Sequence, residues 1–449
     1  MATDAPAKRS EDQPLKRVIT RPLLTLFILG DILGTGIYAL VGEVGGEVGG
    51  AIWTSFLVAI VIALLTAFAY AELVTKYPHA AGAARYVHTA FRQSFFTFMI
   101  AFAVMASGIT SASAAARVFG GDYLAEFVKL PVVAIAIAFV IVLALINFRG
   151  ISESIKVNLV FTLIEVSGLL FIILIGVVTL LGGDGDPGRA FEFNSETAVP
   201  LAIANGAALA FFAMVGFEDS VNVAEETKEP SRIFPRALFT GLIIAGIIYV
   251  LVAITASMVV PTQRLVDSSG PLLEVVKLGP IDVSTKVFSV VALIAVSNSA
   301  LINLIMASRL AYGMGNQGII PSVFSRVHRT RQTPWVSIIF TTLIAIALVS
   351  TTDVEALGAT TAALLLAVFA VVNITVLFLR KNPVDHEHYV APSAIPIVAA
   401  IACALLLTRQ EGEVLLRGLI LLGIGVGLYV LNWLIAGRTG DLKAEELKG

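Results

Sequence analysis

Long apolar runs with few charges alternate with short polar segments along almost the whole chain. As a helix, a run of about 20 residues crosses roughly 30 Å of hydrocarbon. The runs 335–350 and 394–408 are short, and each is either a tilted span or a re-entrant segment, so the count is fixed to within one. The pattern predicts about twelve transmembrane helices, at 23–41, 51–74, 94–118, 131–148, 157–181, 200–224, 237–260, 284–312, 335–350, 356–379, 394–408 and 414–436.

Composition supports a membrane protein built from helices. Hydrophobic residues make up 57% of the chain and charged residues only 14%, whereas a soluble domain carries roughly 25% charged residues. A transmembrane β-barrel would show alternating segments of about ten residues, which this sequence lacks. The expected fold class is therefore all-α integral membrane, with the lipid bilayer as its surroundings.

Basic residues predict the orientation. Most of the 30 Lys and Arg residues fall in segments that are cytoplasmic if the N-terminus lies inside the cell. We therefore expect cytoplasmic tails at 1–22 and 437–449, and a multi-pass protein of the cytoplasmic membrane.

Several other classes of function find no support in the sequence. Cys403 is the lone cysteine, and no Cys/His cluster offers a metal site or a disulfide framework. A net charge of −2 gives nucleic acid no electrostatic footprint, and no phosphate-binding Gly-rich motif suggests direct use of ATP. A channel would need a polar stripe or filter loop, and an enzyme a nucleophile and base, so neither class is favoured. We expect no cofactor and no enzymatic activity.

Two of the predicted helices carry residues that disfavour a continuous span. Gly34 and Gly36 interrupt the first run, and each weakens a helix by about 1 kcal/mol. In the sixth run Gly216 precedes Glu218 and Asp219, and each acid costs roughly 2.5 kcal/mol or more inside a membrane. A Gly-x-Gly pattern alone more often marks tight helix packing. The first and sixth runs correspond, however, if the chain is two repeats of five spans plus two more, and paired interruptions of this kind indicate a transporter's binding site.

Such interruptions suit a zwitterion. An unwound stretch exposes backbone N–H groups at the start of one half-helix and carbonyls at the end of another. A carboxylate fits the N–H groups and an ammonium fits the carbonyls. The sequence therefore predicts an amino acid, or a closely related amine, as the small-molecule substrate.

The residues around these interruptions resemble the signatures of the amino acid, polyamine and organocation permease superfamily. The matching segments, in chain order, are Gly34-Thr35-Gly36-Ile37-Tyr38, Tyr70-Ala71-Glu72-Leu73, Val215-Gly216-Phe217-Glu218, Ala224-Glu225-Glu226-Thr227-Lys228 and Arg309-Leu310-Ala311-Tyr312-Gly313. The run Gly36-Ile37-Tyr38-Ala39-Leu40-Val41-Gly42 is similar to the cationic amino acid transporters and their bacterial relatives. The resemblance covers roughly residues 20 to 380.

This resemblance implies a leucine-transporter-type fold. Residues 23–181 would form the first five-helix repeat and 200–380 the second, inverted one, with helices 11 and 12 at 394–436 outside the repeat. Helices 1 and 6 would be unwound, and transport would proceed by alternating access.

The resemblance also implies roles for individual residues. The substrate carboxylate would meet N–H groups of Thr35, Gly36 and Ile37, and the amine would meet carbonyls of Ile32, Phe212 and Val215. Phe217 would be an aromatic lid. Glu218 would take part in gating or pH sensing, or else be an acid at a helix end bonded to the neighbouring backbone.

Glu165 departs from the pattern of the broad-specificity archaeal relatives. These carry a lysine in the fifth helix, at the place where sodium-coupled relatives bind an ion. Alignment on Gly176 puts Glu165 there, with Gly30, Ser297, Asn298 or Ser299 as expected neighbours. A carboxylate in an apolar helix is desolvated, which favours gain and loss of a proton during transport. Asp31 is a second unusual acid, and the two could share a proton if they touch.

These patterns predict a secondary active transporter that imports an amino acid or related amine, coupled to protons through Glu165. Two alternatives remain open at this point, an exchanger of substrate and product and a sodium-coupled symporter. A purely structural role for Glu165 also remains open.

Overall fold

The computed structural model describes residues 17–78, 82–150, 155–183 and 185–436. Over these ranges the chain is almost entirely helical, and its β features are two isolated bridges that pair Ile19 with Thr227 and Gly49 with Phe193. The predicted all-α membrane fold is confirmed. Residues 1–16 of the predicted N-terminal tail and all of the tail 437–449 lie outside the described residues.

The helices follow the apolar runs of the sequence. In chain order they are α1 (Arg21–Ile32), α2 (Thr35–Val48), α3 (Ile52–Lys76), α4 (Gly82–Phe91), α5 (Ser94–Phe119), α6 (Asp122–Ala125), α7 (Val132–Arg149), α8 (Ile155–Gly182), α9 (Val199–Ala210), α10 (Pro230–Val259), α11 (Thr262–Val266), α12 (Pro271–Leu278), α13 (Thr285–Asn316), α14 (Trp335–Thr351), α15 (Val354–Leu379), α16 (Ala394–Leu407) and α17 (Gly412–Ala436). Within the described residues, four 3₁₀ helices join them, namely η1 (Pro187–Phe191), η2 (Phe211–Met214), η3 (Phe217–Glu226) and η4 (Ser322–Ser325).

Length and hydropathy show how many of these helices can cross a membrane. Among the described residues, nine helical segments are long and apolar enough, and the pair α1 and α2 adds a tenth if it forms one bent span. The two shorter apolar helices, α14 and α16, correspond to the two runs that the sequence pattern marks as short. The count of twelve stays a prediction.

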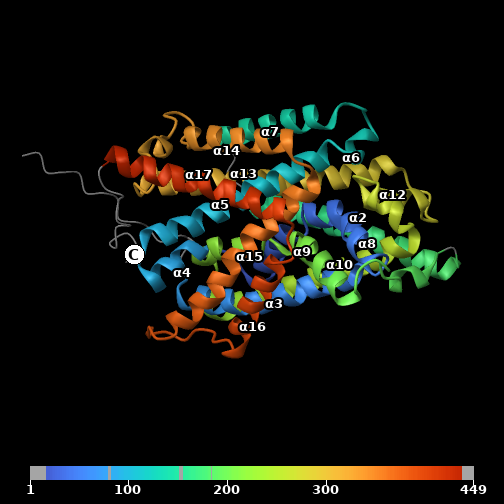
Figure 1. Ribbon diagram of the computed structural model, residues 1–449, viewed down its shortest axis with the longest axis horizontal. Coiled ribbons are helices and arrows are strands. Elements are labelled where there is room, and N and C mark those ends of the chain that lie inside the picture. The colour runs from blue at the N-terminus through green and yellow to red at the C-terminus, as the bar shows by residue number, and fades with distance from the viewer. Residues whose placement is uncertain (1–16, 79–81, 151–154, 184, 437–449) are drawn as a thin grey trace, which may run out of the picture.

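The helices pack in a few extensive pairings (Figure 1). Helix α10 runs along α3 and α1, while α5 runs along α13 and α15. Helix α7 packs on α14 at one edge of the molecule. Only 22% of the apolar windows of α7 and α17 is buried, so these two helices offer most of their surface to lipid. The division into two inverted repeats, 23–181 and 200–380, also stays a prediction.

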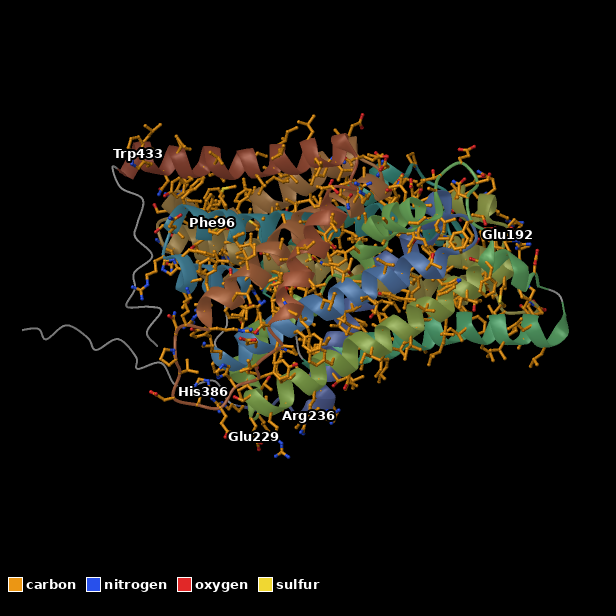
Figure 2. All side chains as sticks on the ribbon, turned by 60° about the horizontal axis from the view of Figure 1, so that its bottom comes forward. Phe96, Glu192, Glu229, Arg236, His386 and Trp433 are labelled. Carbon is orange, nitrogen blue, oxygen red and sulfur yellow. The ribbon has the colours of Figure 1, made fainter. Side chains whose placement is uncertain are left out.

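Charged loops mark the two ends of the molecule. In Figure 2, Glu229, Arg236 and His386 lie near one end and Glu192 near the other. The first three fall in segments that the distribution of basic residues predicts to be cytoplasmic. We call their end the α4 end, because the short amphipathic helix α4 lies there.

Candidate substrate site

The first interruption separates α1 from α2 at Leu33 and Gly34. The two helices are bent by 44° at this point. No side chain caps the start of α2 at Gly34, so the backbone N–H groups of its first turn receive no side-chain acceptor there. The N–H of Gly34 itself turns back to the carbonyl of Ile32, at 2.8 Å.

The second interruption lies between α9 and η3. The α-helix ends at Ala210, the 3₁₀ turn η2 follows, and Val215 and Gly216 connect it to η3. Gly216 has φ +124°, a conformation that side-chain-bearing residues rarely adopt. The Glu218 carboxylate accepts the Gly216 N–H at 2.9 Å, and thus stabilises the turn.

The two interruptions lie directly against each other. A Cβ atom on Gly36 would lie 2.5 Å from the Cα of Ala213, so only glycine allows this approach. A Cβ on Gly216 would lie 2.6 Å from the carbonyl oxygen of Asp31. Gly36 and Gly216 therefore allow the two broken segments to come into close contact. Gly216 also adopts the backbone conformation that the second break requires.

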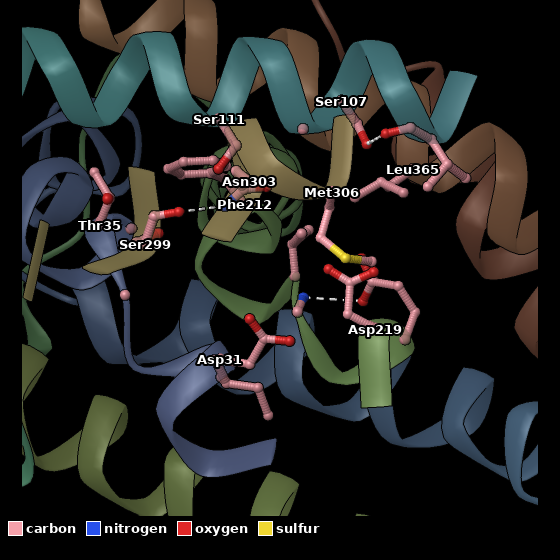
Figure 3. A pocket seen from close by; sticks show the side chains of 18 of the residues that line it. Asp31, Thr35, Ser107, Ser111, Phe212, Asp219, Ser299, Asn303, Met306 and Leu365 are labelled. Carbon is pink, nitrogen blue, oxygen red and sulfur yellow. Dashed lines mark hydrogen bonds between the residues drawn. The ribbon is translucent and has the colours of Figure 1, made fainter. Parts of the chain in front are cut away.

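A narrow crevice of about 40 Å³ opens where the two interruptions meet (Figure 3). Helices α5 and α13 form its other walls. Its lining includes Asp31, Ile32, Gly34, Thr35, Gly36, Ser107, Ser111, Phe212, Val215, Glu218, Asp219, Ser299 and Asn303. The lining therefore offers backbone groups, hydroxyls and three carboxylates to a guest.

Thr35 contributes a buried polar side chain to this lining. Its side chain is buried, and its hydroxyl makes no hydrogen bond within the structure. A buried hydroxyl without a partner costs free energy, typically about 1–3 kcal/mol. A ligand that bonds to this hydroxyl would recover that cost.

The crevice continues into a wider vestibule of about 380 Å³ that opens at the α4 end. Five residues line both spaces, namely Val104, Glu218, Asp219, Met306 and Leu310. Gly82 of α4 and Gln317 after α13 lie at the vestibule's other limits. The site is thus connected to the α4 end.

Tight packing closes the opposite end. Gly42 of α2 lies against the backbone carbonyl of Leu265 in α11, without room for a Cβ. The Tyr123 hydroxyl donates to the Tyr38 carbonyl at 2.9 Å, which ties α6 to α2. The structure is therefore open on one side of the crevice and closed on the other.

The structure places the predicted substrate-binding residues in two groups. Ile32, Thr35, Gly36, Phe212 and Val215 line the crevice. Ile37 is fully buried one residue beyond Gly36 and is not part of the lining.

The carbonyl of Ile32 already has internal partners. It accepts the Tyr249 hydroxyl at 2.5 Å and the Gly34 N–H at 2.8 Å. The carbonyl of Phe212 accepts a longer bond, 3.4 Å, from the N–H of Val215. Phe212 and Val215 are thus better placed than Ile32 to offer a carbonyl to an amine.

Phe217, the predicted lid, does not line the crevice in this conformation. Its ring is fully buried and packs edge-on to Tyr70 at 5.7 Å and against Phe369 at 5.3 Å. Glu218 does line the crevice and also caps the turn at Gly216. Its roles as a crevice acid and as a backbone-bonded acid are therefore compatible.

Glu165 lies behind the crevice rather than in it. It is fully buried, and neither carboxylate oxygen makes a well-formed hydrogen bond within the structure. The amide of Asn298 and the side chains of Tyr38 and Tyr249 lie near it. The Tyr38 hydroxyl donates a hydrogen bond to the backbone carbonyl of Glu165 at 3.4 Å.

The other residues expected near Glu165 have different surroundings. Gly30 packs against Thr162, one turn before Glu165 on α8. Ser297 bonds to Leu293 of its own helix at 2.6 Å, and Ser299 lies in the crevice lining. Asp31 also lines the crevice, on the side of Gly216.

Three polar residues of the crevice walls, Ser107 and Ser111 on α5 and Asn303 on α13, were not singled out by the sequence analysis, and Ser299 was expected beside Glu165 rather than in the crevice. Ser107 and Ser111 form one pair at i, i+4 spacing, and Ser299 and Asn303 form another. Residues four apart share one helix face, so two such pairs within apolar runs are a signal that could have identified these walls. Across the described ranges, no group of three or more His, Cys, Asp or Glu residues could hold a metal ion.

Comparison with known proteins identifies the family. The model of the amino acid permease family matches residues 21–415. The chain is 25% identical over 452 residues to the branched-chain amino acid permease BcaP of Bacillus subtilis (strain 168), which covers 95% of both proteins. It is also 25% identical to the methylthioribose transporter of the same organism, over 94% of this chain and 95% of that protein. It is 28% identical to the vacuolar cationic amino acid transporter 2 of Arabidopsis thaliana, over 86% of this chain and 63% of that protein.

These relatives are transporters, and the matched region includes every residue of the crevice. The resemblance seen in the sequence is thereby confirmed. The chain belongs to the amino acid permease family and is a membrane transporter rather than an enzyme.

Proposed function

We propose that the crevice binds an amino acid, or a closely related amine, for import across the cytoplasmic membrane. The observation that carries this proposal is the uncapped start of α2 beside the buried, unpartnered Thr35 hydroxyl. A substrate carboxylate would accept N–H groups of Thr35, Gly36 and Ile37 together with that hydroxyl. The positive end of the α2 dipole favours the same anion.

The ammonium group would bind on the opposite side of the crevice. Carbonyls of Phe212 and Val215 are the acceptors there, and the carboxyl groups of Asp31 and Glu218 also line the crevice. The cargoes named for the relatives range from branched-chain to cationic amino acids and methylthioribose. The side-chain preference of this chain is therefore best found by a screen of all twenty amino acids and common amines for thermal stabilisation.

We propose that Glu165 couples transport to protons. A buried carboxylate without a strong partner is costly when charged and can be neutralised by a proton. Its helix contacts α1 just before the first interruption, through Thr162 and Gly30. A change of charge at Glu165 can therefore alter the packing of the segment that carries the substrate site.

The orientation forms part of the same proposal. With both termini cytoplasmic, the vestibule at the α4 end faces the cytoplasm, and the structure represents an inward-facing state. The two predicted inverted repeats, 23–181 and 200–380, would then move relative to each other to give alternating access. The last two predicted helices, at 394–436, would lie beside them.

Reconstituted vesicles test both parts of the function. We expect wild-type protein to accumulate amino acid when the outside is acidic, and Glu165→Gln to lose the dependence on the pH gradient while counterflow persists. Glu192→Gln, an exposed acid at the other end, is the matched control. Full pH dependence in Glu165→Gln would exclude proton coupling through Glu165. Transport that needs internal substrate but no gradient would identify an exchanger, and sodium-dependent uptake at constant pH would identify a sodium symporter.

Gly36→Ala tests the binding site separately. A methyl group there collides with the Ala213 backbone and narrows the crevice, so we expect binding of any amino acid to be lost. Retained binding with wild-type affinity would place the substrate elsewhere.

A further inference from the structure

A second, apolar groove lies on the outer surface, between α7 and α14. It has a volume of about 370 Å³. Helix α7 lines it with Ile141, Ala144, Leu145 and Phe148, and α14 lines it with Trp335, Ile338, Ile339, Thr342 and Leu343. Both sets follow helical spacing, so each helix turns one face toward the groove.

The groove is open to the surroundings of the protein. Leu145 and Leu343 are 59% and 62% exposed, although they are large apolar residues. The two helices belong to the outer edge of the bundle, where lipid is the solvent (Figure 1). Hydrocarbon is therefore the natural filling of this groove.

The groove occupies one leaflet. From Ile141 to Phe148 it follows α7 for about 10 Å at 1.5 Å per residue, roughly a third of the hydrocarbon thickness. His328 closes one end, where its ring packs edge-on to Phe148 at 5.1 Å. Trp335 stands at the same end, as is typical of residues at the headgroup level.

Basic groups surround this end of the groove. Arg149 ends α7, and Arg326, Arg329 and Arg331 lie in the loop before α14. The loop is fixed to α7, because the Thr333 hydroxyl donates to the Phe148 carbonyl at 3.0 Å and the backbone of Arg331 lies beside Gly150. All four arginines are exposed, and none forms a salt bridge with another described residue.

Few negative charges compete for these arginines. The segments 132–149 and 321–343 contain no acid, and Glu153, outside the described residues, is the nearest acid in the sequence. Helix α14 also begins here, and Pro334 at its N-cap supplies no side-chain cap. The positive end of a 17-residue helix thus adds to the arginine charge.

We propose that this groove is a binding site for an anionic phospholipid, with one acyl chain between α7 and α14 and the phosphate among Arg149, Arg329 and Arg331. Apolar walls and a basic mouth match the two parts of such a lipid, and basic pockets between transmembrane helices are known to select anionic headgroups. The charge bias of the sequence predicts that this is the cytoplasmic leaflet. The site is separate from the substrate crevice, so it needs no assumption about the cargo.

The test compares phosphatidylglycerol with phosphatidylcholine on purified, delipidated protein. Native mass spectrometry would count bound lipids, and thermal unfolding in detergent would measure stabilisation. We expect wild-type protein to retain phosphatidylglycerol preferentially. Arg329→Gln with Arg331→Gln should reduce that preference roughly tenfold, because each arginine adds electrostatic attraction to an anionic headgroup and so raises the affinity for phosphatidylglycerol.

Two further variants separate the parts of the site. Ala144→Phe fills the groove and should reduce retention of both lipids. Arg92→Gln with Lys381→Gln removes two exposed cations at the same end of the molecule and should change nothing.

Several results would overturn the proposal. Equal retention of the two lipids is one, and an unchanged preference in the double arginine variant is another. Inorganic phosphate that stabilises as strongly as phosphatidylglycerol would rule out the acyl chain. A dimer or a copurifying membrane protein that Ala144→Phe disrupts, while lipid retention is unaffected, would show that protein rather than lipid fills the groove.

Discussion

The carbonyl oxygen of Asp31 lies 2.6 Å from the position that a Cβ atom on Gly216 would occupy. Because Gly216 also has φ +124°, both the contact and the backbone conformation require glycine. This one contact joins the end of α1 to the turn between η2 and η3, and so joins the two walls of the crevice.

Gly216→Ala should therefore damage both stability and transport. The obstructing atom belongs to the backbone, so it cannot move aside as a side chain could. We expect a lower melting temperature in detergent and loss of amino acid uptake in vesicles. Gly423→Ala in α17 is the control, because a Cβ there meets nothing within 4 Å and alanine favours a helix by up to about 1 kcal/mol. Equal melting temperatures for the two variants would contradict the close contact.

A buried ion pair should hold the α4 end together. Arg380 donates to both oxygens of Glu72, at 2.8 and 2.6 Å, and Glu72 is only 1% exposed. The Ala391 N–H adds a third bond to the same carboxylate at 2.9 Å. Arg380→Gln would leave Glu72 buried without its hydrogen-bonded cation, although Lys76 lies nearby, at a cost on the order of 3 kcal/mol.

Chemical unfolding in detergent would measure this cost. Glu72→Gln with Arg380→Gln should recover part of the loss, because the isolated charge is then gone. Arg232→Gln breaks an exposed pair with Glu229, at 3.9 Å, and should cost less than about 1 kcal/mol. A double variant less stable than the sum of its single changes would speak against the isolated-charge explanation.

Cysteine labelling should show which side the crevice faces. Cys403 is fully buried beside the Thr66 hydroxyl, so we expect the natural protein to resist a membrane-impermeant maleimide. Gln317→Cys lines the vestibule and should react from the α4 end, more slowly when substrate is bound. Gln263→Cys, in α11 at the closed end, should react from the opposite side. Labelling of both variants from the same side would refute the predicted topology.

Acid should weaken the contacts around α12. Glu126 accepts the Thr285 hydroxyl at 2.6 Å and pairs with Lys277 at 3.3 Å. The Thr285 hydrogen bond, followed by Lys277, lowers the pKa of Glu126 below its ordinary 4.5. The folded protein therefore binds this proton less readily than the unfolded chain, so the stabilisation is complete above pH 4.5 and is lost as the pH falls through the folded-state pKa.

The pH dependence of the melting temperature checks this prediction. Glu126→Gln should lower the melting temperature at neutral pH. On acidification, its melting temperature should fall less than that of the natural protein. Glu192→Gln, at the same end of the molecule, serves as the reference. If the melting temperatures of Glu126→Gln and the natural protein fall in parallel as the pH is lowered, Glu126 does not contribute to the acid response.

The interruptions of the first and sixth spans could be located from sequence because their cause is local. Gly34, Gly36 and Gly216 weaken a helix wherever they occur, and Glu218 is costly inside a span regardless of its neighbours. In the structure Gly34 lies in the gap between α1 and α2 and Gly216 lies between η2 and η3, whereas Gly36 lies within α2 and α9 already ends at Ala210. The sequence pattern could therefore predict the residues that act through their own backbone.

Residues that act through their side chains were harder to place. Phe217 follows Gly216 directly, yet its ring packs on Tyr70 and Phe369 from distant parts of the chain. The Ile32 carbonyl accepts the nearby Gly34 N–H, but its second bond comes from the side chain of Tyr249, 217 residues later. Which partner a group finds depends on how each helix rotates about its axis, and packing against its neighbours sets that rotation.

The sequence by itself determined that this protein is a helical membrane transporter and predicted two interrupted spans, because lipid requires apolar helices and glycine weakens them through local energetics. Only the tertiary structure decided that Ser107, Ser111, Ser299 and Asn303 share a crevice with Thr35, that Glu72 finds Arg380, and that α7 and α14 enclose a groove with a basic mouth. These relationships join residues far apart along the chain, and local propensity carries no information about which distant helix faces will meet.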